Sequence, residues 1–419
     1  MMLLLISVYI LMLGFRSWLL SLNIGNLKQY GLTVPVEFNG VIDAERLRAM
    51  SAYTVESSRL SFIEMLAGGC INLVFLFSGA LGLYDRWIAS LTGSLVPGGI
   101  LFALILVTAG MILDIPFDLV KHFIIEQRHG FNSMTPRLWI ADFFKSLALS
   151  AFFSSLIVGS ALAIMAYSPA WWWLWVWAFL LVFGIFIMYI SPYVIEPLFF
   201  KFEPVTVEGL ELKIRSLMER AGLKVSRVFQ VDASRRSRHS NAYFTGIGRV
   251  KRIVLFDTLI QQLTQDELLA VLAHEVGHWK KKHVLKSIVM SETIALCGLF
   301  LAFHLLSWRG LPGLVGLSGA SLYAKAVIIG FLGSLAMFPL TPLFSALSRR
   351  NENEADRFAR ELTGRPENLA SALIKLSKEN LANLHPHPWY AAFYYSHPPI
   401  VERVRRLRTA PGIVSSRTP

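Results

Sequence analysis

LTQDELLAVLAHEVGHWKKKHVLK, residues 263–286, combines a helix start, two histidines on one helix face and the approach to an apolar run. Thr264 is followed three residues later by Glu267, which is the capping-box pattern of a helix N-terminus. Within the predicted helix His274 and His278 are four residues apart, so both imidazoles project from the same face. The segment therefore predicts a capped helix that presents two histidines side by side.

Glu275 lies beside the two histidines and completes an HExxH pattern, which is typical of a catalytic zinc site. In such a site two neutral imidazoles hold the metal, while the carboxylate removes a proton from a water molecule. The alternative is a pair of solvated histidines on a surface helix. We favour the metal site because the motif falls on a capped helix and Gly277 keeps that helix slim beside the candidate ligands.

A catalytic zinc ion needs a third protein ligand, and the best candidates lie in RRNENEADRFAREL, residues 349–362. Glu352 and Asp356 are four residues apart and share one face of a predicted helix. One carboxylate can bind the metal while the other accepts the free N–H of a ligand imidazole. Spacing alone leaves these two roles interchangeable, and a plain charged helix face is a further alternative. Glu354 points away from this face, and we expect it to be solvated.

The composition places this site in a membrane protein. Of the 419 residues, 54% are hydrophobic and only 16% are charged, and the mean hydropathy is +0.52. A soluble protein this apolar could not cover its surface with polar side chains. The formal net charge of +12 could suggest a nucleic-acid partner, but the basic residues lie in loops between apolar runs. We therefore expect no nucleic-acid partner and attribute the charge to the positive-inside rule.

Seven apolar stretches are long enough to cross a bilayer. They fall near residues 2–20, 62–84, 97–116, 145–167, 170–195, 284–306 and 322–345. If the N-terminus lies outside, the outer loops contain only Arg86 and Arg309, and nearly all other basic residues lie on the inner side. The sequence thus predicts a multi-pass protein whose metal site lies on the cytosolic side.

Several segments together closely resemble the M48 metallopeptidases and, within that group, the Ste24 type, the CAAX prenyl protease 1 family. The segments are HEVGHWKKKH (274–283), NENEAD (351–356), HSNAYFTGIG (239–248), YSHPPIVER (395–403), AYTVESSRLSF (52–62) and IEQRHGFNSMTP (125–136). They occur in compatible order over most of the chain. Together they are far more specific than HExxH alone.

The resemblance implies a set of metal-site residues. Three zinc ligands, His274, His278 and Glu352, hold one Zn²⁺ per chain. Glu275 is the general base. Because Glu352 is the first glutamate of the matching segment, the resemblance separates its role from that of Asp356, which becomes the partner of a ligand imidazole.

Further residues implied by the resemblance concern the substrate and the transition state. The edge strand that pairs with the backbone of an extended peptide consists of Asn241, Ala242, Tyr243 and Phe244. His397 stabilises the developing oxyanion as an imidazolium, with a rigid HPP turn as the structural alternative. Arg403 orders the loop around His397 or pairs with Asp356.

The fold implied by the resemblance is mainly α: a ring of seven long transmembrane helices around a water-filled chamber, capped by a small α+β zinc metalloprotease domain on the inner face. We divide the chain into transmembrane helices 1–5 (1–195), a catalytic segment (196–283), transmembrane helices 6 and 7 (284–345) and a C-terminal helical segment with the third ligand (346–419). Residues 228–231 and 252–256 predict short strands around the hairpin-like segment 241–248.

Ionisable residues within the spans indicate water or polar partners at membrane depth. Asp114, Glu292 and Lys325 lie in or at the ends of predicted spans. If the motif helix continues without a break, Glu292 lies about 21 Å beyond His278, at ~1.5 Å per residue. There it lines the cavity or packs against another helix.

The resemblance implies a peptidase that cleaves near the C-terminus of prenylated CAAX proteins, or of membrane-associated polypeptides in quality control. A site-2-type intramembrane protease is the nearest rival, but it places HExxH inside an apolar span, whereas here three lysines, 280–282, follow the motif. A seven-helix scaffold or transporter with a structural zinc site is the alternative from another functional class.

We expect a monomer in a lipid bilayer that acts on polypeptides. The C-terminal SSRTP contains no retention signal. Together with the short N-terminus, this tail favours a bacterial inner membrane over the endoplasmic reticulum.

Overall fold

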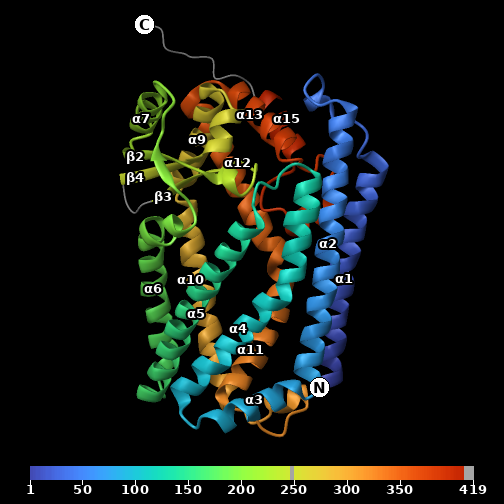
Figure 1. Cartoon of the computed structure of the whole chain (residues 1–419), viewed down its shortest axis with the longest axis vertical. Coiled ribbons are helices and arrows are strands. Elements are labelled where there is room, and N and C mark those ends of the chain that lie inside the picture. Colours follow the sequence, from blue (N-terminus) through green and yellow to red (C-terminus); the bar gives the residue numbers. More distant parts are fainter. Residues whose placement is uncertain (246–249, 410–419) are drawn as a thin grey trace.

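The structure is a computed structural model that describes residues 1–245 and 250–409. Long helices run along most of its length, and a mixed cap of short helices and strands lies at one end (Figure 1). The N-terminus lies at the opposite end from this cap. Within the described residues, seven helices are long and apolar enough to cross a membrane, which confirms the predicted number.

Capping residues explain where several of the long helices begin. Asp43 accepts a hydrogen bond from the backbone N–H of Arg46 at 2.7 Å, and Thr135 precedes a proline in the first helical position. The elements of the seven spans are α1 (Met2–Tyr30), α2 (Ala44–Phe77), α4 (Leu95–Val120) with the π-helix η2 (Lys121–Glu126), α5 (Pro136–Tyr167), α6 (Trp172–Val194) with the turn η3 (Glu196–Leu198), α10 (His283–Ser307), and α11 (Leu322–Met337), which continues through the turn η6 (Phe338–Leu340) into α12 (Thr341–Thr363).

The second predicted span, 62–84, is wrong in its boundaries. Gly79 adopts a left-handed φ of 88° and starts a separate helix, α3 (Ala80–Leu91). This helix lies across the end of the molecule that is farthest from the cap (Figure 1). In compensation α2 begins at Ala44, and the last span continues to Thr363. Both extensions consist largely of polar residues. They are helical all the same, because the backbone hydrogen bonds of a helix do not require apolar side chains.

The helix with the HExxH motif is α9 (Gln265–Lys280), and its predicted capping box is confirmed. The Thr264 hydroxyl accepts from the backbone N–H of Glu267 at 3.4 Å, and the Glu267 carboxylate accepts from the backbone N–H of Thr264 at 2.8 Å. The unbroken helix into the membrane is wrong, because Lys282 adopts a left-handed φ of 58° and α10 starts anew at His283.

Of the three ionisable residues expected at membrane depth, Lys325 has a side-chain hydrogen bond, whereas Oε2 of Glu292 is buried without a hydrogen-bond donor among the described residues. Trp177 on α6 donates its indole N–H to the carbonyl oxygen of Glu292 at 3.1 Å, so Glu292 lies where α6 packs on α10. Lys325 donates to the carbonyl oxygen of Leu306 at 3.2 Å. Asp114 is exposed on α4.

The cap contains a four-stranded sheet with the strand order β1-β2-β4-β3. The strands are β1 (Phe202–Pro204), β2 (Lys224–Val231), β3 (Ala242–Thr245) and β4 (Val250–Phe256). β2 runs parallel to β4, and β3 runs antiparallel to β4 as an edge strand. The predicted strands at 228–231 and 252–256 are therefore confirmed. In the predicted hairpin-like segment 241–248, residues 246–248 lie outside the described residues.

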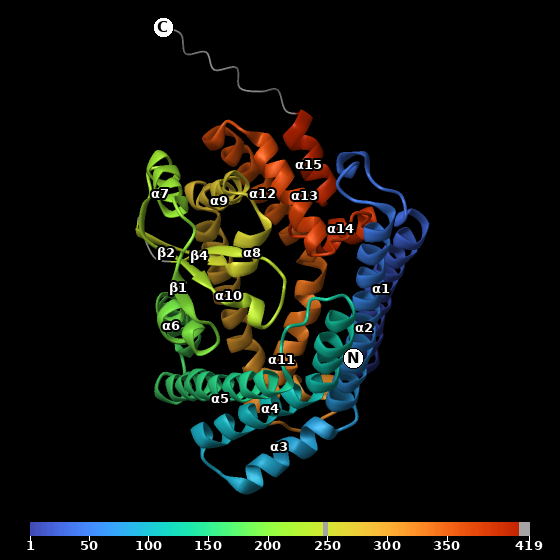
Figure 2. The same ribbon diagram turned by 45° about the horizontal axis from the view of Figure 1, so that its top comes forward.

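Helices around the sheet complete the larger hydrophobic core. They are α7 (Leu210–Arg220), α8 (Asp257–Gln262), α9, α13 (Pro366–Glu379) and α15 (Ile400–Thr409). A further helix, α14 (Pro388–Tyr394), packs against α12 and α1. Side chains from α7, β4 and α9 are fully buried together, among them Ile214, Ile253 and Leu272. Figure 2 shows α13 and α15 at the outer end of the cap, beyond α9.

A second core lies near α3, and the long helices between the two cores are little buried. This core includes Leu81 and Ile88 of α3 with Phe102 of α4 and Ile328 of α11. In the most apolar windows of α4, α5 and α6 only 6% of residues are buried, and in α10 none. Each long helix thus exposes more than one face over the middle of its length.

The motif helix α9 crosses α12 at Gly277. A Cβ atom on Gly277 would lie 2.9 Å from Cα and 3.1 Å from the carbonyl oxygen of Ala355. Both contacts are with backbone, which cannot turn aside as a flexible side chain can. The absence of a side chain at Gly277 therefore sets the distance between the two helices.

We predict that Gly277→Ala lowers the free energy of unfolding by about 1–3 kcal/mol, since the new methyl group forces α9 and α12 apart. The matched control is Gly298→Ala in α10, where a Cβ atom meets nothing within 4 Å. This control should be neutral or raise stability by up to about 1 kcal/mol, because alanine favours helix over glycine. Thermal unfolding midpoints measure both, and equal midpoints would contradict the steric account.

Candidate metal centre

Three potential ligand atoms converge where α9 crosses α12. Nε2 of His274 lies 3.2 Å from Nε2 of His278 and 3.4 Å from Oε2 of Glu352. Nε2 of His278 lies 3.3 Å from Oε1 of Glu352. Within residues 1–245 and 250–409, these three side chains are the one cluster of histidine, cysteine and acidic groups placed to share a metal ion.

The spacing of these atoms fits a tetrahedral zinc site. Zinc binds imidazole nitrogen and carboxylate oxygen at about 2.0–2.2 Å, so ligand atoms at tetrahedral corners lie about 3.3–3.6 Å apart. The three separations of 3.2–3.4 Å come close to that length. Oε2 of Glu352 is also buried without a hydrogen-bond donor among the described residues, and a cation would satisfy it.

Asp356 holds His274 from the side away from the other two ligands. Its Oδ1 lies 2.8 Å from Nδ1 of His274, an ion-pair distance, although the angles are not those of a regular hydrogen bond. Arg403 of α15 donates to the same carboxylate twice, from Nε to Oδ2 at 2.9 Å and from Nη2 to Oδ1 at 2.7 Å. This bidentate pair fixes the carboxylate, which in turn orients Nε2 of His274 toward the ligand cluster.

The carboxylates make the ligand cluster favourable for positive charge. Burial alone would lower the pKa of His274, but Asp356 and Glu352 outweigh burial and raise this pKa to about 9. A site that stabilises a proton on His274 this strongly also favours a metal cation in the same place. Glu275, which follows His274 on α9, has a pKa raised above its usual value because loss of hydration disfavours its charged form.

A chain of hydrogen bonds that the sequence analysis missed supports His278. Its Nδ1 lies 3.1 Å from Nδ1 of buried His283, whose Nε2 lies 3.2 Å from Oε2 of Glu354. A metal bound at Nε2 would leave that nitrogen without a proton, and His278 would then donate from Nδ1 to His283, with His283 donating to Glu354. Glu354 is 31% exposed, which agrees with its predicted solvation, but the sequence analysis missed its contact with His283. The sequence did contain His283 five residues after His278. The two imidazoles come into contact because the left-handed residue Lys282 changes the direction of the chain between them.

His397 reaches the cluster from the loop before α15. Its Nε2 lies 3.3 Å from Oε1 of Glu352, and its Nδ1 lies 2.9 Å from the hydroxyl of Ser396. Although the side chain is 60% exposed, loss of hydration around the ring lowers its pKa; Arg403 adds to this shift and Glu352 opposes it. The lowered pKa favours a neutral ring in this structure, and the imidazolium expected beside a developing oxyanion stays a prediction.

A polar cleft of about 680 Å³ opens beside these residues. Ser240 and Asn241, which lead into β3, line the cleft together with His397 and Arg403. Beyond Asn241 the predicted edge-strand residues Ala242, Tyr243 and Phe244 form β3, which contacts α9. The structure therefore brings the predicted peptide-binding strand and the candidate ligands to neighbouring positions.

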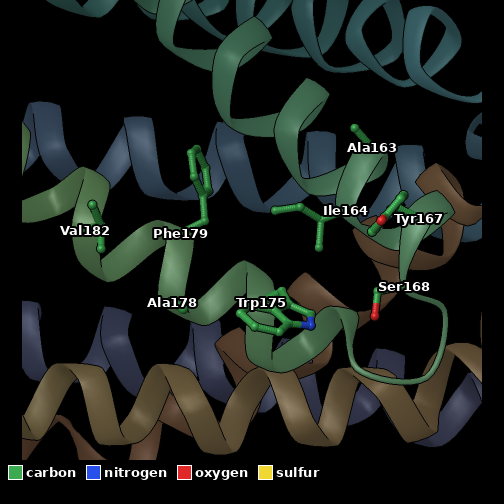
Figure 3. Close-up of a pocket in the computed structure, with 8 residues that line it drawn as sticks. All are labelled: Ala163, Ile164, Tyr167, Ser168, Trp175, Ala178, Phe179 and Val182. Carbon is green, nitrogen blue, oxygen red and sulfur yellow. The ribbon is translucent and has the colours of Figure 1, made fainter.

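A cavity of about 720 Å³ lies far from this site, between α5 and α6 (Figure 3). Side chains such as Ile164 of α5 and Trp175 and Phe179 of α6 point into it. Its lining offers the hydroxyl groups of Tyr167 and Ser168 but no carboxylate, imidazole or amine. This cavity therefore has none of the groups that the metal chemistry needs.

We predict that Asp356→Asn weakens metal binding about 10- to 100-fold, because the imidazole of His274 loses its orienting carboxylate. Metal content after titration with a chelator measures the loss. The control is Asp266→Asn at the start of α9, an exposed carboxylate paired with Arg365. Since Asp356→Asn also removes a partner of buried Arg403, thermal unfolding is followed in parallel. A chelator midpoint like that of the wild type would contradict the orienting role.

Comparison with known proteins places this architecture among membrane peptidases. Residues 23–201 match the family model "CAAX prenyl protease N-terminal, five membrane helices", and residues 204–410 match "Peptidase family M48". Among curated proteins, the CAAX prenyl protease 1 homolog of Oryza sativa subsp. japonica is 35% identical over 396 residues, covering 90% of this chain and 91% of the relative. CAAX prenyl protease 1 of Saccharomyces cerevisiae is 36% identical over 332 residues, covering 75% and 73%.

The fold agrees with these sequence matches. The crystal structure of S. mikatae Ste24p superposes with a TM-score of 0.87 and 30% identity, covering 97% of this chain and 98% of that one. The match extends over both the long helices and the cap. From the two family models, the near full-length relatives and this superposition, the chain belongs to peptidase family M48, as a multi-pass membrane metallopeptidase of the Ste24, or CAAX prenyl protease 1, type.

Proposed function

We propose that the chain binds one Zn²⁺ through His274, His278 and Glu352 and uses it to hydrolyse peptide bonds. The observation that carries this proposal is the convergence of His274, His278 and Glu352, whose Nε2 atoms lie 3.2 Å apart and each 3.3–3.4 Å from one of the two Glu352 oxygens. Glu275 directly follows His274 on the same helix. Three protein ligands leave one tetrahedral position for water or substrate. A zinc ion held by these three residues would supply Lewis-acid chemistry, which makes water acidic enough to attack a peptide at neutral pH.

The chain's own side chains move the protons and hold the geometry. Glu275 takes the proton of the attacking water and returns it to the leaving amine. Its raised pKa suits both transfers, since a base works best when its pKa is not far below the working pH. His397 donates its N–H to the oxygen that becomes negative, and Asp356 with Arg403 keeps His274 in place.

The substrate is an extended polypeptide that pairs with the edge strand β3, which includes Ala242, Tyr243 and Phe244, and with Asn241 directly before it. Main-chain pairing holds a peptide with little sequence preference. The relatives named CAAX prenyl protease 1 support a substrate cleaved near a prenylated C-terminus. Membrane-associated polypeptides in quality control are the other substrate class that this mode of binding admits.

The long helices enclose a water-filled chamber below the cap. Contacts link α1 with α2, α4 with α5, α5 with α6, α6 with α10 and α10 with α11, an order that suits a ring. Ile112 and Asp114 lie about 160° apart around α4, yet both are exposed. A carboxylate in contact with lipid is costly, so the Asp114 face meets water while the Ile112 face meets lipid.

The cap lies on the cytosolic side, and the protein acts as a monomer. The segments rich in lysine and arginine lie at the cap end, and the N-terminus lies at the other end (Figure 1). By the positive-inside rule, the end with the basic segments faces the cytosol. The rule applies to a bacterial inner membrane and to the endoplasmic reticulum alike. Functionally, residues 1–195 and 284–345 supply the membrane part, while 196–283 and 346–419 supply the ligands.

We predict that Glu275→Gln keeps its metal but cleaves peptides roughly 10²–10⁴-fold more slowly, because the general base is lost while the ligands stay. Metal content and cleavage of a fluorogenic peptide are measured together. Phenanthroline should abolish wild-type cleavage, and added Zn²⁺ should restore it. Wild-type rates in the variant would refute the role of Glu275. A wild-type protein that binds zinc but cleaves no peptide would instead favour the scaffold or transporter alternative.

The chamber predicts different reactivity for two cysteines on one helix. In a background without Cys70 and Cys297, Asp114→Cys should react with a charged, membrane-impermeant thiol reagent, since it faces water. Ile112→Cys, at the same depth on the opposite face, should stay unreactive in a bilayer. Equal protection of both cysteines would contradict the chamber. Equal labelling would mean that α4 is not in contact with lipid.

A further inference from the structure

Three segments singled out in the sequence have residues with no part in the chemistry described above. They are AYTVESSRLSF (52–62), IEQRHGFNSMTP (125–136) and HSNAYFTGIG (239–248). Each contributes one polar side chain to a single cluster: Tyr53 from α2, Glu126 from η2 and His239 from the loop before β3. Residues far apart in the chain thus meet where the membrane helices reach the cap.

Glu126 is the centre of this cluster. It is only 6% exposed, and its two carboxylate oxygens have different partners. The Tyr53 hydroxyl donates to Oε1 at 2.6 Å, and Nε2 of His239 lies 3.2 Å from Oε2. Phe131 stacks on the His239 ring with 4.1 Å between centroids. A carboxylate removed from water in this way is stable only while its partners stay in place.

The partners of His239 require both ring nitrogens to be donors. Nδ1 lies 3.2 Å from Oδ1 of Asn380, and the same oxygen accepts from the backbone N–H of Ser240 at 3.3 Å. This second bond identifies the atom facing His239 as the amide oxygen, so Nδ1 donates to it. Nε2 faces the carboxylate of Glu126 and donates as well. The contact between His239 and Glu126 therefore joins the cap to the membrane helices.

The same region is joined through the backbone. The N–H of Arg238 donates to the carbonyl oxygen of Phe131 at 3.0 Å, and the Ser133 hydroxyl donates to the carbonyl oxygen of Ser234 at 2.6 Å. Glu126 is the last residue of the π-helix η2, a rare conformation that often marks functional positions. The end of α4 is thus shaped to meet the segment that leads into β3.

The segment 239–241 is also held from the cap, so its position is fixed from both sides. The Thr258 hydroxyl donates to the carbonyl oxygen of His239 at 3.0 Å, and the Ser240 hydroxyl donates to Gln262 at 2.5 Å. Directly after it, Asn241 enters the polar cleft and β3 begins at Ala242. Any shift of His239 is therefore passed on within two residues to the edge strand.

We propose that His239 and Glu126, with Tyr53, are positioning residues that hold the substrate-binding edge strand at its working distance from the metal centre. This inference rests on the proposed function, because it assumes that β3 binds the peptide. The pair touches neither the metal ligands nor the cleavage site. It acts on substrate binding by tying the start of β3 to the ends of α2 and α4.

The test is peptide binding in the Glu275→Gln background, where bound peptide is not consumed. His239→Ala should weaken binding of a peptide that the wild-type protein cleaves by about 10- to 100-fold, as misplacement of a binding element by ~1 Å does. In the active protein the same change should raise KM more than it lowers kcat. Metal content should stay at the wild-type level.

Two further variants separate positioning from general destabilisation. Glu126→Gln keeps an acceptor for Tyr53 and a polar partner for His239, so it should retain much of the binding that Glu126→Ala loses. Glu56→Gln is the matched control, since Glu56 pairs with Arg128 and His129 on the same helices without contacting the segment 239–241. This control should bind peptide like the wild type.

Several outcomes would overturn the inference while leaving the peptidase intact. Unchanged peptide binding in His239→Ala would do so, as would a loss of metal in step with the loss of binding. If Glu56→Gln lost as much peptide binding as His239→Ala, any disturbance where the membrane helices meet the cap would be enough to weaken binding. Failure of the proposed function is a different result: the wild-type protein would then show no chelator-sensitive cleavage before any of these variants is made.

Discussion

The close approach of α9 and α12 at Gly277 and Ala355 is the constraint on which the metal centre depends. Gly277 directly precedes His278, and Ala355 lies between Glu352 and Asp356. The contact that joins the two backbones therefore also sets every distance between the histidines and the carboxylates. The arrangement of these candidate ligands is a consequence of helix packing, because a side chain at Gly277 would change all of the distances between α9 and α12 together.

Charge balance explains why so many ionised groups are tolerated in one buried place. Glu275, Glu352 and Asp356 contribute three negative charges, and Arg403 contributes one positive charge, which leaves two negative charges uncompensated. Buried charges are stable only when paired, and a divalent cation supplies the missing charge. The same surplus explains why His274 holds a proton so strongly when no cation competes for it.

Features that lie within one helix could be predicted from the sequence. Features that depend on a change of chain direction, or on where two helices cross, could not. The capping box and the shared face of His274 and His278 follow from helical periodicity alone. The order of Glu352 and Asp356 depends on where another helix crosses. Hydropathy could not predict the breaks at Gly79 and Lys282, because a single left-handed residue changes chain direction without changing composition. The contacts of the Tyr53–Glu126–His239 cluster could not be predicted either, since its members lie on three separate segments of the chain.

Each working part of the site is attached to a different part of the membrane domain. α9 is followed at once by α10, α12 continues α11, and the segment before β3 is held by α2 and the end of α4. The distance between the candidate metal ligands and β3 therefore depends on the arrangement of these membrane helices. A cap removed from its helices would lose the geometry that its own core does not encode. The helices that carry the candidate ligands thus lead directly into membrane-spanning helices.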